Sequence, residues 1–250
     1  MFKTFFASCV LLFCVPVSAT EITSPFYLPN AGHLLNQIRG NYTKNKIKTT
    51  PLTRTYHRAL NNELTVGLGA GFAALVSGEL NWTRQKQVTT LSEPHTTAYK
   101  VGLKGQWETG PVLTQLSSLY HQTDNVAFLP RRTLETHLRF GKPLKSMTPY
   151  LYLTGDFPLN ARPEFNNPVY RGETGVFQSI NQKMTLDTAL YLQYDKNIQE
   201  RSYGIRGEWS YLATSRVAFG LNGEWQARGK AHNSTKTYHQ SVGAKVTFSF

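Results

Sequence analysis

The last thirteen residues, Tyr238–Phe250, read YHQSVGAKVTFSF, and this stretch decides the fold class. In its second half, apolar residues alternate with small or polar ones. Because successive side chains of a strand point to opposite faces, the stretch predicts a strand with one apolar face and one polar face. The apolar face holds Val242, Ala244, Val246, Phe248 and Phe250.

The same alternation recurs upstream in segments of about ten residues that are separated by polar turns. An even number of such segments returns both chain ends to the same side of a sheet that closes on itself. Short turns are predicted near 60–62, 108–110, 142–146, 181–183 and 213–215. The predicted strands lie near residues 33–45, 52–60, 64–82, 99–107, 111–123, 134–140, 149–157, 168–180, 186–194, 203–211, 217–226 and 238–250.

Residues 1–19 have the features of a secretory signal peptide, with a short basic start, an apolar run and a small-residue cleavage site. Both cysteines, Cys9 and Cys14, lie inside this segment, so residues 20–250 contain none. The predicted mature chain therefore has neither disulfides nor a thiolate for catalysis or zinc. A lipid anchor at Cys14 is the alternative, but Phe13 stands where a small residue is wanted.

No stretch of about 18 apolar residues follows the signal segment, which excludes a transmembrane helix. A closed barrel remains compatible with the mean hydropathy of −0.36, because only alternate residues of each strand meet lipid. A soluble β-sandwich would show the same alternation. Aromatic residues near the strand ends favour the barrel, since they suit the two membrane interfaces. The predicted membrane girdle is Trp107, Phe140, Tyr194, Tyr203, Trp209 and Trp225.

The final segment resembles the C-terminal assembly signal of Gram-negative outer-membrane β-barrel proteins, in which a terminal Phe follows alternating apolar residues. Phe248 and Phe250 match that signal. The resemblance implies a porin-like, multi-pass barrel in the bacterial outer membrane, inserted by the barrel assembly machinery. The stretch Ser24–Pro29 resembles the segment that leads into the barrel of some small outer-membrane transporters. Neither resemblance identifies a subfamily.

The prediction is therefore an all-β protein: residues 20–250 form one closed antiparallel transmembrane β-barrel of about twelve strands. Both termini are expected in the periplasm, the protein is expected to be a monomer, and the backbone radius is about 12 Å. Charged residues on the polar strand faces then point into the lumen, with the two signs nearly balanced. The predicted pore-lining residues are Arg39, Lys100, Lys104, Glu135, His137, Arg139, Arg171, Glu173, Asp187, Arg206, Glu208, Glu224 and Lys245.

The chain carries a formal net charge of +12, with 27 Lys and Arg against 15 Asp and Glu. A roughly neutral lumen leaves the surplus for the longer loops. The cations expected there are Lys44, Lys46, Lys48, Arg84, Lys86, Arg131, Arg132, Arg228, Lys230 and Lys236. Phosphates of outer-membrane lipids, including lipopolysaccharide, lie at about the height of these loops and are the expected partners of their cations. A merely solvated basic rim is the alternative. Export argues against nucleic acid as a partner.

Sites for covalent chemistry are few. His137 lies between Glu135 and Arg139 on one strand face, but no serine is placed to complete a catalytic relay. No histidine or carboxylate spacing suits a metal, and no cofactor is expected. The predicted function is passive passage of small polar solutes without enzymatic activity. The alternatives are a non-conducting structural or surface-interaction barrel with basic extracellular loops and, third, an enzyme that modifies or hydrolyses outer-membrane lipids.

Overall fold

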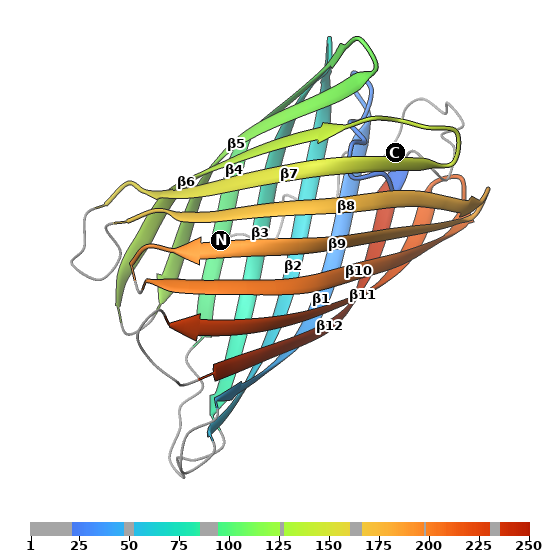
Figure 1. Cartoon of the computed structure of the whole chain (residues 1–250). Helices are drawn as coiled ribbons and strands as arrows, with labels where there is room; N and C mark the ends of the chain where they lie inside the picture. The colour runs from blue at the N-terminus through green and yellow to red at the C-terminus, as the bar shows by residue number, and fades with distance from the viewer. Residues whose placement is uncertain are drawn as a thin grey trace.

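The computed structural model describes residues 22–47, 53–85, 95–125, 128–160, 167–197, 199–230 and 236–250, so the predicted signal peptide lies outside it. Twelve β-strands make up nearly all of the described chain (Figure 1). None of its described helical residues forms a helix long and apolar enough to cross a membrane. The strands are β1 (Leu34–Ile47), β2 (Thr53–Gly69), β3 (Phe72–Gln85), β4 (His95–Thr109), β5 (Val112–Asn125), β6 (Phe128–Gly141), β7 (Met147–Pro158), β8 (Val169–Asn181), β9 (Met184–Asp195), β10 (Glu200–Thr214), β11 (Val217–Lys230) and β12 (Lys236–Ser249).

The strands form a closed ring in which each pairs with its sequence neighbours and β12 pairs with β1. All the pairings are antiparallel. At the seam, the backbone N–H of Leu34 donates to the carbonyl of Phe250, and the N–H of Phe250 donates back, both at 2.9 Å. The predicted fold, a closed antiparallel barrel of twelve strands, is confirmed.

The two ends of the barrel differ. At one end, here called the turn end, β1 begins, β12 ends, and connections of two to five residues join β2 to β3 and each later even strand to the next. At the other end, the loop end, connections extend up to ten residues. The even strand count therefore places the beginning of the barrel beside its C-terminus.

One predicted turn is wrong. Residues 60–62 lie inside β2, which continues to Gly69, and the chain reverses at Gly69, Ala70 and Gly71. These three residues have φ values of 89°, 50° and 77°, the left-handed region that favours glycine. A bulge next to the two-residue turn keeps the apolar side chains at even positions in both strands. Because the alternation continues across the reversal, it predicted one strand over 64–82 where there are two.

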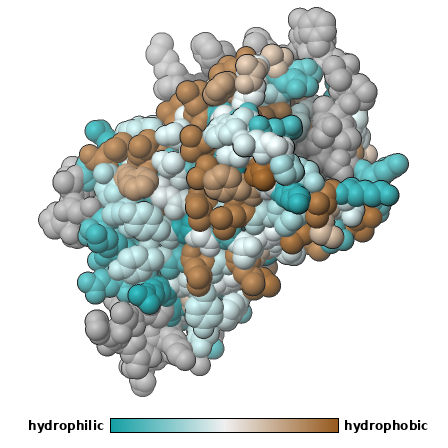
Figure 2. Space-filling model, turned by 45° about the horizontal axis from the view of Figure 1, so that its top comes forward, coloured by the Kyte–Doolittle hydropathy of each residue, from teal (hydrophilic) through white to brown (hydrophobic). Residues whose placement is uncertain are grey.

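The two faces of the wall have opposite character. Exposed large apolar side chains lie at outward positions of the strands, as at Leu192 and Val242, which are 70% and 61% exposed. The exceptions are Leu144 and Leu159, which lie in connections, and Phe250, which directly follows β12. Buried polar side chains such as Thr247 lie on the inner face. Figure 2 shows apolar side chains spread over the outside of the strands on the face in view.

The chain before β1 folds back into the turn end of the lumen. Ile22, 1% exposed, packs with Leu35 of β1 and Ala218 of β11. Phe26 packs with Tyr150 of β7 and with its buried neighbours on β8 and β9. Strands β1 and β7 are opposite in the ring, so this segment, here called the N-terminal plug (residues 22–33), spans the lumen. Sequence analysis placed a resemblance here but no inward-folded segment.

A charge at mid-height on the outer wall tests the assignment of faces. Leu190, 59% exposed on β9, points outward, whereas Gln193 of the same strand points inward. In phospholipid vesicles, Leu190→Arg is expected to lower the free energy of unfolding by about 2–4 kcal/mol, because the charge lies in hydrocarbon. Gln193→Arg, the matched control, is expected to change it by less than about 1 kcal/mol. Equal effects in urea titrations would reject the assignment.

Candidate functional site: the charged inner wall

The register places all the predicted pore-lining residues on the inner face of the wall. Eleven of them form ion pairs within three side-chain clusters along the wall, and a twelfth, Lys104, pairs with Glu63. Arg139 instead contacts aromatic rings and the N-terminal plug. Whether a solute touches these residues stays a prediction.

The first cluster centres on Arg206 of β10. Its Nε lies 2.8 Å from Glu173 Oε2, its Nη1 lies 3.0 Å from Asp187 Oδ2, and its Nη2 donates to the Tyr150 hydroxyl at 2.8 Å. Tyr150 in turn donates to Asp187 Oδ1 at 2.6 Å. The Glu173 side chain is only 4% exposed. Charge-assisted bonds of this kind compensate the cost of burying a carboxylate.

The same cluster continues along the wall to β11. Arg171 Nε lies 2.7 Å from Glu173 Oε1, and Arg171 Nη1 lies 3.7 Å from Glu224 Oε1. Tyr191 donates a hydrogen bond to Glu224, and its ring centroid lies 3.7 Å from the Arg171 guanidinium carbon. Tyrosines that complete this network were not among the predicted residues, although alternation placed Tyr191 on the polar face of its strand.

The second cluster surrounds Glu135 of β6. Lys100 Nζ donates to Glu135 Oε2 at 2.8 Å, and His121 Nδ1 lies 2.6 Å from Glu135 Oε1. His137 Nε2 lies 3.5 Å from the same carboxylate, and His137 Nδ1 shares a 2.9 Å hydrogen bond with the Tyr152 hydroxyl. Both ring nitrogens of His137 therefore have partners, which leaves neither nitrogen free to activate a nucleophile.

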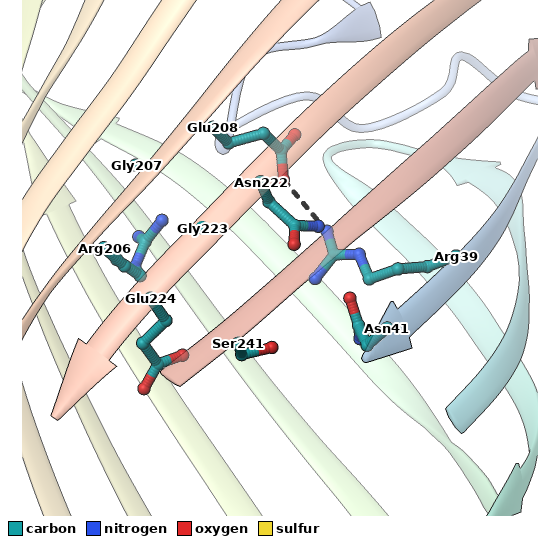
Figure 3. A pocket seen from close by; sticks show the side chains of 9 residues that line it. All are labelled: Arg39, Asn41, Arg206, Gly207, Glu208, Asn222, Gly223, Glu224 and Ser241. Carbon is teal, nitrogen blue, oxygen red and sulfur yellow. Dashed lines mark hydrogen bonds and ion pairs between the residues drawn. The ribbon is translucent and has the colours of Figure 1, made fainter. Parts of the chain in front are cut away.

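The third cluster joins β1, β10 and β12. Arg39 Nη2 lies 3.2 Å from Glu208 Oε2, and Lys245 pairs with the other oxygen of Glu208. The Arg39 side chain is 40% exposed, whereas that of Lys245 is 7% exposed. Figure 3 shows the Arg39 guanidinium directed at Glu208 across a small cavity of about 110 Å³. The cavity is lined by Arg39, Asn41, Arg206, Gly207, Glu208, Asn222, Gly223, Glu224 and Ser241.

Gly243 makes room for two amide side chains beside this cavity. It lies on β12 between Asn41 of β1 and Asn222 of β11. A Cβ at position 243 would lie 2.0 Å from Asn41 Oδ1 and 2.6 Å from Asn222 Oδ1. Any side chain here would therefore displace the amides that border the cavity.

The charged groups brace the wall without bridging the lumen. Every ion pair recorded between described residues joins strands at most three apart in the ring, whereas opposite strands are six apart. The charged side chains can therefore both stabilise the wall and line the lumen, because a side chain paired with its neighbour along the wall still faces the interior.

Arg139 connects the wall to the N-terminal plug. Its guanidinium carbon lies 4.3 Å from the Tyr152 ring centroid and 5.6 Å from that of Phe26. Arg139 Nη1 also donates to the Pro25 carbonyl and, at 3.3 Å, to Gln115 Oε1. An inward cation of β6 therefore anchors the plug by a hydrogen bond and by cation–π contacts.

The cations expected in the longer loops mostly belong to strands, which corrects that expectation. The strands extend further toward the loop end than their alternation indicated, so these residues occupy strand ends. Lys48 and Lys86 lie outside the described residues. The strand residues are Lys44 and Lys46 of β1, Arg84 of β3, Arg131 and Arg132 of β6, Arg228 and Lys230 of β11, and Lys236 of β12.

The predicted aromatic girdle and assembly signal occupy outward positions. Trp107, Phe140 and Trp209 lie toward the turn end, and Tyr194, Tyr203 and Trp225 lie toward the loop end. The rings of Phe248 and Phe250 are stacked, with centroids 6.3 Å apart and an interplanar angle of 14°. Their roles in membrane contact and in assembly stay predictions. Within the described ranges, no group of three or more His, Cys, Asp or Glu has the arrangement of a metal site.

No family model and no curated protein matches the sequence. Solved structures do match the fold. The COG4313 outer membrane channel from Pseudomonas putida F1 is 8% identical, with a TM-score of 0.68 over 91% of this chain and 98% of that one. The chain has the fold of outer-membrane channels and porins.

Two further structures share this fold. The NanC porin is 12% identical, with a TM-score of 0.56 over 85% of this chain and 98% of that one. The CymD monoaromatic hydrocarbon channel is 9% identical, with a TM-score of 0.52 over 94% of each chain. At these identities the likeness concerns the fold and identifies no subfamily.

Removing one member of the first cluster tests its contribution to stability. Arg206→Met leaves the carboxylates of Glu173 and Asp187 without their cation, and it is expected to lower the free energy of unfolding by about 3–5 kcal/mol. Arg39→Met, at a side chain that is 40% exposed, is expected to cost less than about 1 kcal/mol. Guanidinium titrations of the two variants in detergent measure both free energies of unfolding. Equal losses would contradict the larger contribution of the Arg206 cluster to stability.

Proposed function

We propose that this protein is a passive outer-membrane channel for small polar solutes. The observation that carries the proposal is the inner wall, where charged side chains of both signs pair along the strands and no ion pair between described residues crosses the lumen. Rings of fixed charges and hydrogen-bonding groups are how channels select solutes. The channel and porin names of the structures with this fold support the same function.

In the proposed orientation, the turn end and both termini face the periplasm, and the loop end faces outward. Bacterial single-chain barrels have short periplasmic turns and longer extracellular loops, which is the asymmetry of this barrel. The signal peptide at 1–19 would export the chain from a Gram-negative cytoplasm, and the assembly machinery would recognise β12 with Phe248 and Phe250. The proposed protein acts as a monomer, without a cofactor and without covalent chemistry.

The N-terminal plug sets the expected width of the solute path through the lumen. It contacts β1 and β11 through Ile22 and the opposite wall through Phe26, so it narrows the lumen at the turn end. This observation also favours the second candidate, a non-conducting barrel whose basic outer end contacts a surface. The two candidates differ in whether ions pass the plug.

Conductance in planar bilayers decides between these functions. The wild-type barrel is expected to give small, well-defined channel steps, and Phe26→Ala should enlarge them because the largest plug contact with β7–β9 is lost. Leu159→Ala, at an exposed residue of the β7–β8 connection at the loop end, is the control and should leave the steps unchanged. A pure, folded preparation of the wild type and of Phe26→Ala that gives no steps at any voltage would support the non-conducting barrel.

Arg39 is the ion-paired inner cation with the most exposed side chain, and it should influence which ions pass. Arg39→Gln is expected to move the reversal potential in a salt gradient toward cation selectivity, since Glu208 loses part of its compensation. Arg201→Gln removes the same charge from an outward position of β10 and serves as the matched control. If both variants shift the potential equally, the inner wall does not set the selectivity.

A further inference from the structure

The two faces of the wall differ in charge as well as in polarity. Among the described strands, Asp124 of β5 is the one carboxylate at an outward position, and all other strand carboxylates point inward. Most inward cations pair with these carboxylates, as in the three clusters, whereas Arg139 contacts the N-terminal plug. The surplus positive charge of the described strands therefore lies on the outside of the barrel, near the loop end.

Three adjacent strands carry most of this outward charge. Lys44 and Lys46 of β1 and Arg58 of β2 hold outward positions close to the loop end. The backbone register also pairs Arg54 of β2 with Lys46, and Arg84 of β3 with Tyr56 of β2. On the other nine strands, the outward cations whose side chains are described are Arg132 of β6 and Arg201 of β10.

Two tyrosines alternate with these cations. Tyr42 is the register partner of Arg58, and Tyr56 is the register partner of Lys44. The two rings are stacked, with centroids 6.1 Å apart and an interplanar angle of 29°. Register partners and their diagonal neighbours lie within roughly 5–8 Å of one another. Five residues therefore form one basic and aromatic patch: Tyr42, Lys44, Lys46, Tyr56 and Arg58.

The height of the patch matches a membrane interface. Lys44 and Lys46 lie ten and twelve residues after Leu34, the first residue of β1. A tilted strand crosses the hydrocarbon in about 9–11 residues, so the two lysines lie close to where β1 leaves it. Below the patch the outward side chains are apolar and exposed, as at Ile38 and Leu60. Tyrosine rings prefer the level between hydrocarbon and water, where one edge is apolar and the other is wet.

The cations of the patch have no counter-ion among the described residues. Lys44, Lys46 and Arg58 form no ion pair with any described carboxylate, and Arg58 is exposed. A cluster of like charges on adjacent strands costs free energy through repulsion unless an anion lies among them. The arrangement therefore calls for an external anion at the membrane surface.

We propose that the patch formed by Tyr42, Lys44, Lys46, Tyr56 and Arg58 binds the phosphate group of an anionic lipid in the outer leaflet. The inference rests on the proposed outer-membrane placement with the loop end outward, but not on conduction. Arg58 can donate two hydrogen bonds to one phosphate, and the lysines add point charges. The tyrosine rings would pack against the part of the headgroup nearest the acyl chains.

Native mass spectrometry of the detergent-solubilised barrel, titrated with bisphosphorylated lipid A, tests the proposal. Each basic residue near an anionic headgroup contributes about five-fold in affinity, so Lys44→Gln/Lys46→Gln/Arg58→Gln is expected to weaken binding about 100-fold at low salt. Lipid A that lacks its phosphates should bind the wild type weakly. Its affinity should equal that of bisphosphorylated lipid A for the triple variant. If the triple variant does not fold, Arg58→Gln alone should weaken binding about five-fold.

The matched control is Arg132→Gln/Lys196→Gln/Arg201→Gln, which removes the same charge at the same end, away from the patch. This control should retain wild-type affinity for lipid A. Equal losses in both triple variants, or no loss in the patch variant, would overturn the proposal. Displacement of lipid A by inorganic phosphate at equal concentration would also overturn it, because the ligand would then be a free anion. Channel steps of the patch variant, recorded separately, should equal those of the wild type, which separates this proposal from the proposed function.

Discussion

The closure of the sheet is the constraint on which the rest of the structure depends. A strand at the edge of an open sheet leaves its backbone N–H and C=O groups unpaired, which is costly wherever water is excluded. Here Leu34 and Phe250 exchange two backbone hydrogen bonds, and the seam continues as an antiparallel pairing along β1 and β12. Closure in turn divides every strand into an outer and an inner face, so side-chain polarity follows from position in the strand.

Closure also explains how the inner charges are arranged. Inside the ring, a buried carboxylate such as Glu173 needs cations beside it, and Arg206 of β10 and Arg171 of its own strand supply them. Pairing along the wall satisfies these groups, and no ion pair between described residues reaches across the lumen. No ion pair of the described part of the chain includes an outward cation, so the same polypeptide leaves its surplus charge where an external anion can approach.

Alternation, together with the aromatic residues near the strand ends and the C-terminal resemblance, predicted the fold. Alternation also placed the predicted pore-lining charges on the inner face, because a period of two is independent of where a strand ends. It failed at Gly69–Gly71, where the reversal preserves the parity of the apolar positions. Partners within the clusters could not be predicted either. Arg39 and Glu208 are three strands apart, and their meeting depends on the stagger of the intervening strands, which no local pattern encodes.

The N-terminal plug was beyond sequence analysis for another reason. Residues 22–33 do not alternate, and their position depends on a cavity that the strands create only after closure. Phe26 fits against Tyr150 because Gly141 leaves space beside it, a relation between three distant segments.

Gly67 adds a consequence for how this architecture varies. Its α-carbon faces the backbone of the plug, and a Cβ there would lie 1.9 Å from the Asn30 carbonyl oxygen. Seating the plug thus requires a hydrogen atom in place of a side chain at one position of β2. Among barrels of similar build, the residue at this position would serve as a diagnostic marker that separates forms with a seated plug from forms without one.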